Sequence, residues 1–159
     1  EGFWRSFLAA VIIFPAFAFL RWHDLVSAPD DFPVLRYMTT EVIAYVIKWV
    51  AFPLLMFHIT PMLGRAERYV AFMTVYNWAS VLQMGVYLLA LALGVLFPMV
   101  GTGGFVMIAV IATLVYSIFI PRLTLSVPIP TASAIVIADF LLSIVITSIG
   151  IRLAVGQLF

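Results

Sequence analysis

Three charged side chains fall within stretches of the sequence that are otherwise apolar. Lys48 and Asp139 lie near the middle of two such stretches, and Glu41 lies toward the start of the first. Insertion of a charge near the centre of a membrane helix costs about 2.5–3.5 kcal/mol, so such residues are usually paired or functional. Their chemistry could therefore be an interhelical ion pair between Lys48 and Asp139, or a relay for protons or ions.

The spacing of these residues favours the ion pair. With a rise of about 1.5 Å per residue, Lys48 and Asp139 differ in depth by about 6 Å, which a lysine side chain can largely bridge. Glu41 shares a helix face with Lys48 and can compete for it. A relay would need more titratable groups across the membrane, whereas only Ser143 and Thr147 continue the Asp139 face. We therefore expect a buried ion pair, with the relay as the alternative.

Motifs for catalysis and for metal or cofactor binding are missing from the sequence. It has no cysteine, no phosphate-binding loop with its lysine, no Ser-His-Asp set and no HExxH pattern. His23 and His58 are expected on opposite sides of a membrane, where they cannot share a metal. The glycines at 101–104 are expected in a tight hairpin at 98–104, not in a nucleotide site. We predict no catalytic residue, no metal site and no cofactor, hence a protein that is not an enzyme.

The elements that carry these residues are predicted to be membrane helices. Hydrophobic residues make up 65% of the 159 residues and charged residues 9%, whereas soluble domains are roughly 25% charged. A membrane helix needs about 20 apolar residues. The fold class predicted is all-α, a single polytopic transmembrane helical bundle of about five spans over residues 1–159. The predicted spans are 3–20, 39–60, 69–96, 105–120 and 131–152.

The first span is interpreted as a retained helix. Residues 3–20 are too long and too aromatic for a signal-peptide core, and Trp4 and Trp22 mark its two interfaces. The polar stretch from Arg21 to Arg36 is predicted to be a surface loop.

The arginines at the span ends predict the orientation. Four fall on the N-terminal side and three on the other, which favours a cytoplasmic N-terminus by the positive-inside rule. The first group is Arg5, Arg65, Arg68 and Arg122, and the second is Arg21, Arg36 and Arg152.

Small and amide side chains predict how the helices pack. Pairs of small residues four apart allow two backbones to approach closely, and amides form hydrogen bonds across helix interfaces. The small-residue pairs are Ala90 with Gly94, Ala134 with Ala138, and Ser143 with Thr147, and the amides are Asn77 and Gln83. These residues are packing candidates, within the chain or against another membrane protein.

The order of these features resembles the Yip1 family of compact five-span proteins. The likeness lies in the glycine-containing connector at residues 63–70, in Tyr76 within residues 74–79, and in the connector at 126–134. The chain is similar to compact bacterial members, since it lacks the Asp-Leu-Tyr-Gly-Pro motif of eukaryotic ones. The resemblance implies the architecture, and with the short loops it favours the bacterial cytoplasmic (inner) membrane.

These features together favour a protein that acts by association, as an accessory subunit, a scaffold or a membrane-organising factor. Its expected partners are membrane lipids and either another membrane protein or further copies of itself. The net charge of +1 gives no reason to expect nucleic acid. The alternative is a subunit of a small-solute or ion transporter or channel that uses Lys48 and Asp139 near the bilayer midplane.

Overall fold

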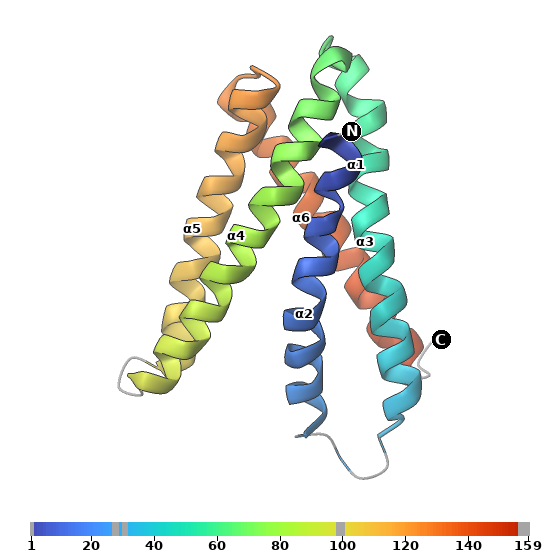
Figure 1. The fold of residues 1–159 in the computed structure, drawn as a ribbon, viewed down its shortest axis with the longest axis vertical. Helices are drawn as coiled ribbons and strands as arrows, with labels where there is room; N and C mark the ends of the chain where they lie inside the picture. Colours follow the sequence, from blue (N-terminus) through green and yellow to red (C-terminus); the bar gives the residue numbers. More distant parts are fainter. Residues whose placement is uncertain (1, 27–28, 30–31, 98–100, 156–159) are drawn as a thin grey trace. The chain divides into compact units, whose positions relative to one another are not determined.

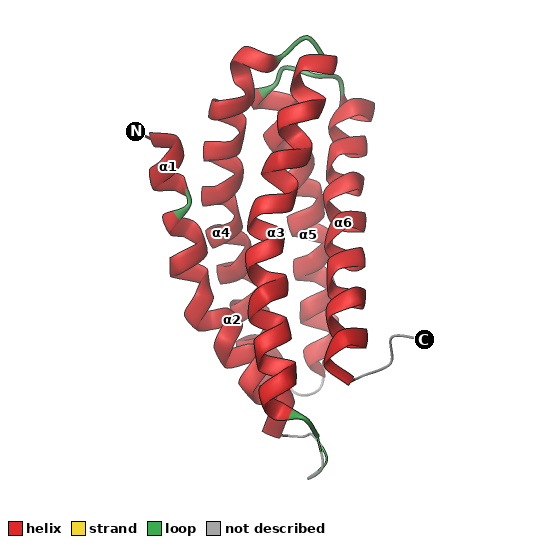
Figure 2. Cartoon of the chain, turned by 90° about the vertical axis from the view of Figure 1, so that its right-hand side faces the viewer, coloured by secondary structure: helices red, strands yellow, loops and turns green. Residues whose placement is uncertain are grey.

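The computed structural model describes residues 2–26, 29, 32–97 and 101–155, and these residues form helices joined by short connections (Figure 2). The described part of the chain contains no strand, so the predicted all-α fold class is confirmed. The described residues form six α-helices and one 3₁₀ turn, and the α-helices are labelled in Figure 1. They are α1 (Gly2–Ser6), α2 (Leu8–Val26), α3 (Val34–Met62), η1 (Ala66–Arg68), α4 (Tyr69–Leu96), α5 (Gly101–Thr124) and α6 (Ile129–Val155).

In the described part of the chain, five helical segments are long and apolar enough to cross a membrane, as predicted. They are Gly2–His23, Val34–Met62, Ala66–Leu96, Thr102–Thr124 and Ile129–Ala154. The chain is an integral membrane protein with five candidate spans.

Two predicted connectors are shorter than expected. Residues 21–26 belong to α2 and residues 34–36 to α3, so most of the expected surface loop at 21–36 is helix. Gly101–Gly104 form the first turn of α5 and not a loop; residues 98–100, the rest of that expected hairpin, lie outside the described residues. A prediction from hydropathy ends a span at the first polar residues. The helix itself continues into the headgroup region, because polar side chains are tolerated there, so the predicted connectors were too long.

The chain divides into two compact units. The first unit comprises Glu1–Ile13 and Glu67–Val136, and the second comprises Phe14–Ala66 and Ile137–Phe159.

In the first unit, α4 and α5 form an antiparallel hairpin and α1 packs against α4 (Figure 1). The hairpin is closed at Gly94, where an ideal Cβ would lie 2.4 Å from the Cα of Thr102. The α1 contact includes the rings of Phe3 and Tyr69, whose centroids are 6.0 Å apart. Small residues and ring contacts therefore set the helix spacing in this unit.

In the second unit, the part of α2 after Phe14 packs against α3, and α6 packs against α3 from another side. The rings of Phe17 and Tyr45 have centroids 4.6 Å apart. An ideal Cβ on Gly150 of α6 would lie 3.5 Å from the Cβ of Ala44. These contacts bring three helices together around the N-terminal half of α3.

Candidate functional site

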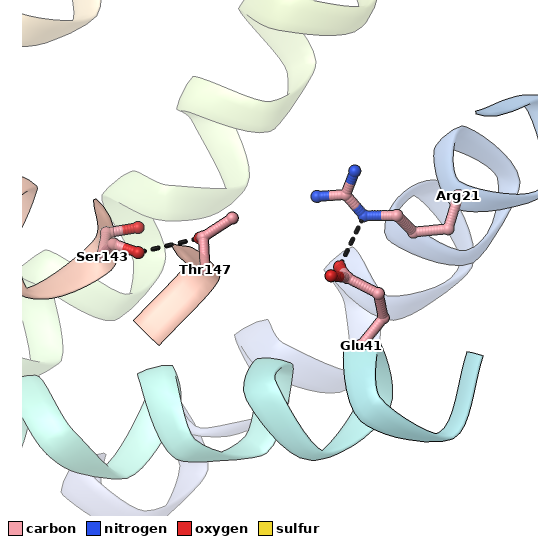
Figure 3. A network of polar contacts seen from close by, with 4 residues as sticks. All are labelled: Arg21, Glu41, Ser143 and Thr147. Atoms are coloured by element: carbon pink, nitrogen blue, oxygen red, sulfur yellow. Dashed lines mark hydrogen bonds and ion pairs between the residues drawn. The ribbon is translucent and has the colours of Figure 1, made fainter. Parts of the chain in front are cut away.

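The second unit contains a buried ion pair between α2 and α3. Arg21 Nε lies 2.8 Å from Glu41 Oε2, and the side chain of Glu41 is only 5% exposed whereas that of Arg21 is 29% exposed. The distance is that of an ion pair, although the alignment is not that of a hydrogen bond. Figure 3 shows the arginine side chain reaching across from α2 to the carboxylate on α3. The carboxylate is thus held in the protein interior by a cation on the neighbouring helix.

The register of the two antiparallel helices explains this pairing. Phe17 packs on Tyr45, and four residues along each helix Arg21 meets Glu41. Four residues are about one helical turn, so consecutive turns of α2 and α3 stack against each other. The guanidinium carbon of Arg21 also lies 5.5 Å from the centroid of the Phe17 ring, an arrangement that favours a cation near an aromatic face.

Lys48 lies on the same face of α3 as Glu41, two turns further along the helix. This face carries the buried residues Glu41, Ala44 and Phe52, and Lys48 itself is half-buried. Lys48 lies within Coulombic range of the Glu41 carboxylate and of the Arg21 guanidinium. The second unit therefore gathers two cations and one carboxylate within about two turns of α3.

One face of α6 turns toward this cluster. Asp139, Ser143, Thr147 and Gly150 share that face by their spacing of four, four and three residues, and Gly150 contacts Ala44 and approaches Glu41. Thr147 Oγ1 donates a hydrogen bond to the Ser143 carbonyl oxygen at 2.8 Å. Figure 3 shows these two residues in the same region as Arg21 and Glu41.

The contact at Gly150 sets the relative depth of Lys48 and Asp139. Gly150 of α6 lies at about the level of residue 42 of α3. Because α6 runs antiparallel to α3, Ser143 then lies close to the level of Lys48. Asp139 then lies about 8 Å further along the axis. Glu41 and Arg21 are charged neighbours of Lys48. Its pairing with Asp139 stays a prediction.

The two amides expected at helix interfaces both lie in the first unit. Asn77, fully buried, donates a hydrogen bond from Nδ2 to Ser6 Oγ at 2.9 Å, and Ser6 Oγ donates to the Phe3 carbonyl oxygen at 2.7 Å. Gln83 Nε2 donates to Ser117 Oγ at 3.0 Å. The first bond joins α4 to α1 and the second joins α4 to α5.

The small-residue pairs differ in their placement. Ala90 and Gly94 are both buried on α4, at the close approach to α5. Ala134 is exposed and Ala138 is half-buried, whereas Ala132 and Ile135 are the buried residues at that end of α6. Ala134 is therefore not on the buried face at that end of α6, and packing of this pair against another membrane protein stays a prediction.

Arg21 is the residue of this cluster that sequence reasoning missed. It follows a continuous apolar run and begins a polar stretch, so hydropathy assigned it to a loop. The sequence did contain a signal for this contact. Phe17 and Arg21 are four residues apart on one helix, and Glu41 and Tyr45 are four apart on the next, so two antiparallel helices can bring the aromatic residues together and the charged residues together. Among the described residues, no group of three His, Cys, Asp or Glu side chains could hold a metal ion.

Comparison of the chain with protein-family models, with curated proteins and with solved structures finds no match in any of the three.

Proposed function

We propose that this chain acts by association within a membrane, as an accessory subunit, a scaffold or a membrane-organising factor. The observation that carries the proposal is that polar side chains of the described spans contact one another across helix interfaces. Asn77 contacts Ser6, Gln83 contacts Ser117, and Arg21 contacts Glu41, each across two helices of one unit. These polar groups stabilise the packing of the chain's own helices. The apolar faces are then left for lipid or for partner helices.

The surroundings proposed for the chain follow from its charges and from its resemblance to the Yip1 family. We place it in the bacterial cytoplasmic membrane with the N-terminus in the cytoplasm. The partners proposed are membrane lipids together with another membrane protein or further copies of the chain. Short connections support contacts made within the bilayer, because they offer little surface outside it.

The test is the composition of the assembly in native membranes. The chain would be extracted into nanodiscs without denaturation, and the proteins that migrate with it would be identified and counted by mass spectrometry. A stoichiometric membrane-protein partner supports the proposal, as does a defined homo-oligomer without transport activity. Purification as a lone monomer that moves a solute in proteoliposomes overturns it.

A second function is favoured by the interior of the second unit. Lys48, Glu41 and Arg21 lie near the Ser143 and Thr147 face of α6, so polar side chains follow one another along part of the span. Transporter sites near the midplane use polar groups of this kind on interrupted helices, and Pro53 lies within α3. The alternative is therefore a small-solute or ion transporter or channel subunit that uses Lys48 and Asp139.

Paired substitutions at Lys48 and Asp139 separate the two functions. If the two residues form an ion pair for stability, Lys48→Met lowers stability and Lys48→Met with Asp139→Leu recovers much of the loss. If they carry transport, the double variant folds and loses solute flux in proteoliposomes. Equal stability of both single variants and the parent would remove the ion-pair interpretation.

A further inference from the structure

The charged residues of the first unit are confined to one end of its helices. From Tyr69 to Pro121 the sequence contains no charged residue, so most of α4 and α5, with their connector, is without charge. Apart from Glu1, which lies outside the described residues, the charges of this unit are Arg5, Arg68, Arg122 and Glu67. With Glu1 counted, the unit has three arginines and two glutamates, a surplus of one positive charge. Arg68 and Arg122 are located where α4 begins and α5 ends.

A hydrogen bond at the end of the hairpin links Arg68 to the segment that follows Arg122. Arg68 Nη1 donates to Ser126 Oγ, which links the start of α4 to the segment that follows α5. Arg122 lies in the last turn of α5, four residues before Ser126. The Leu125 N–H bonds the Pro121 carbonyl oxygen at 3.0 Å, which closes the last turn of α5. Arg122, in that last turn, therefore lies four residues along the chain from Ser126, the residue that Arg68 contacts.

The segment that carries Arg122 and Ser126, residues 121–127, is well packed. Pro121 and Leu125 are fully buried, and Val127 is 8% exposed. Arg122 is exposed, and the side chain of Arg68 is 41% exposed. Ser126 has a φ of 52°, a left-handed conformation that is uncommon outside glycine, and its hydroxyl is the one that Arg68 holds. Two guanidinium groups are thus presented to the surface by a fixed backbone.

The nearest acid reduces this positive charge only in part. Glu67 Oε1 is 3.9 Å from Arg68 Nε, and the Glu67 side chain is 67% exposed. Exposed pairs at such distances contribute little, because water and salt screen them. The patch of Arg68, Arg122 and Ser126, called here the α4–α5 basic patch, therefore keeps a positive surface potential.

We propose that the α4–α5 basic patch binds the phosphate of anionic phospholipid headgroups. It lies at the ends of two membrane-spanning helices, the level at which lipid phosphates lie. Guanidinium groups bind phosphate oxygens through paired, charge-assisted hydrogen bonds. The Ser126 hydroxyl adds a polar group beside them. The ligand class is a phosphate monoanion of a membrane lipid, such as the headgroup of phosphatidylglycerol.

The test measures lipid selectivity in nanodiscs of mixed phosphatidylcholine and phosphatidylglycerol. Lipids retained by the chain are counted by native mass spectrometry, and selectivity is the enrichment of phosphatidylglycerol over phosphatidylcholine. The parent is expected to enrich phosphatidylglycerol. An arginine near the surface of an anionic membrane contributes about a fivefold change in binding, so Arg122→Gln is expected to lower the enrichment about fivefold.

Arg36→Gln is the matched control. Arg36 is also exposed and lies near the start of α3, on a different helix from the α4–α5 basic patch. The variant removes the same charge but no part of the patch, so it is expected to lower the enrichment less than Arg122→Gln does. Ser126→Ala keeps every charge but removes the hydroxyl that Arg68 contacts, so it reports on positioning. Unfolding of each variant in pure phosphatidylcholine checks that the fold is retained.

Three results would overturn the proposal. The first is a parent that retains the two lipids in their bulk ratio. The second is an equal loss of enrichment in Arg36→Gln and Arg122→Gln, which would mean that net charge and not this patch selects the lipid. The third is displacement of phosphatidylglycerol by inorganic phosphate at its physiological concentration, which would assign the patch to a free anion.

Discussion

Gly94 is the position in the first unit where one added carbon atom meets the backbone of another helix. An ideal Cβ at Gly94 would lie 2.4 Å from Thr102 Cα, 2.7 Å from Thr102 Oγ1 and 2.8 Å from Thr102 Cβ. Gly94→Ala therefore cannot be accommodated by a side-chain rotation, because the nearest atom belongs to the α5 backbone. The two helices must separate locally by about 1 Å to reach ordinary van der Waals distance.

The size of the effect follows from two opposing terms. Overpacking of a tight contact costs about 1–3 kcal/mol, and a close backbone approach lies at the upper end of that range. Alanine in place of glycine in a helix returns up to about 1 kcal/mol. We expect Gly94→Ala to lower the free energy of unfolding by about 2 kcal/mol.

Gly85→Ala is the matched control on the same helix. Nothing lies within 4 Å of an ideal Cβ at Gly85, so this variant is expected to be as stable as the parent or slightly more stable. The assay is equilibrium unfolding in mixed micelles, followed by circular dichroism and tryptophan fluorescence. Thr102→Ala added to Gly94→Ala is expected to restore little stability, because it leaves the Thr102 Cα in place. Equal stability of Gly94→Ala and Gly85→Ala would refute the close approach of α4 and α5.

The remaining predictions concern the polar contacts and are measured by the same unfolding assay. Arg21→Met is expected to cost about 3 kcal/mol, because it removes the cation in direct contact with the buried Glu41 carboxylate and leaves only the more distant Lys48; Glu41→Leu in the Arg21→Met background should recover much of that loss. For Lys48→Met, adding Asp139→Leu is expected to recover less stability than Glu41→Leu recovers for Arg21→Met. The reason is that Lys48 and Asp139 are offset by about 8 Å along the helix axis, which makes a direct ion pair hard to form. Asn77→Ala is expected to cost about 1 kcal/mol, and a loss well above that value would indicate a larger network.

The spans could be predicted from the sequence because hydropathy is set by the bilayer. The third predicted span, 69–96, has the same bounds as α4 (Tyr69–Leu96), since Arg68 and Pro98 delimit one long apolar run. The second predicted span, 39–60, is shorter than α3 (Val34–Met62). The part of α3 before residue 39 contains Arg36, which a helix retains in the headgroup region although a hydropathy window excludes it.

Which residues pair could not be predicted, because pairing depends on the register between helices. Hydropathy located Glu41 and Lys48 within one span, and their spacing placed them on one face. Neither property indicates that α2 continues to Arg21, or that Arg21 lies one turn beyond the Phe17–Tyr45 contact. A contact between side chains twenty residues apart depends on the relative position of α2 and α3 to within a single turn.

The two units hold their helices by interactions of different range, and this difference bears on the proposed functions. In the first unit, Asn77–Ser6 and Gln83–Ser117 are hydrogen bonds between neutral groups, which depend strongly on distance and alignment. In the second unit, the attraction between Arg21 and Glu41 decreases only with the inverse of distance. The electrostatic part of the α2–α3 contact therefore tolerates a small displacement better than the hydrogen bonds of α4 do. A transport function, which needs helices that move, is better served by the second unit, and a stable docking surface by the first.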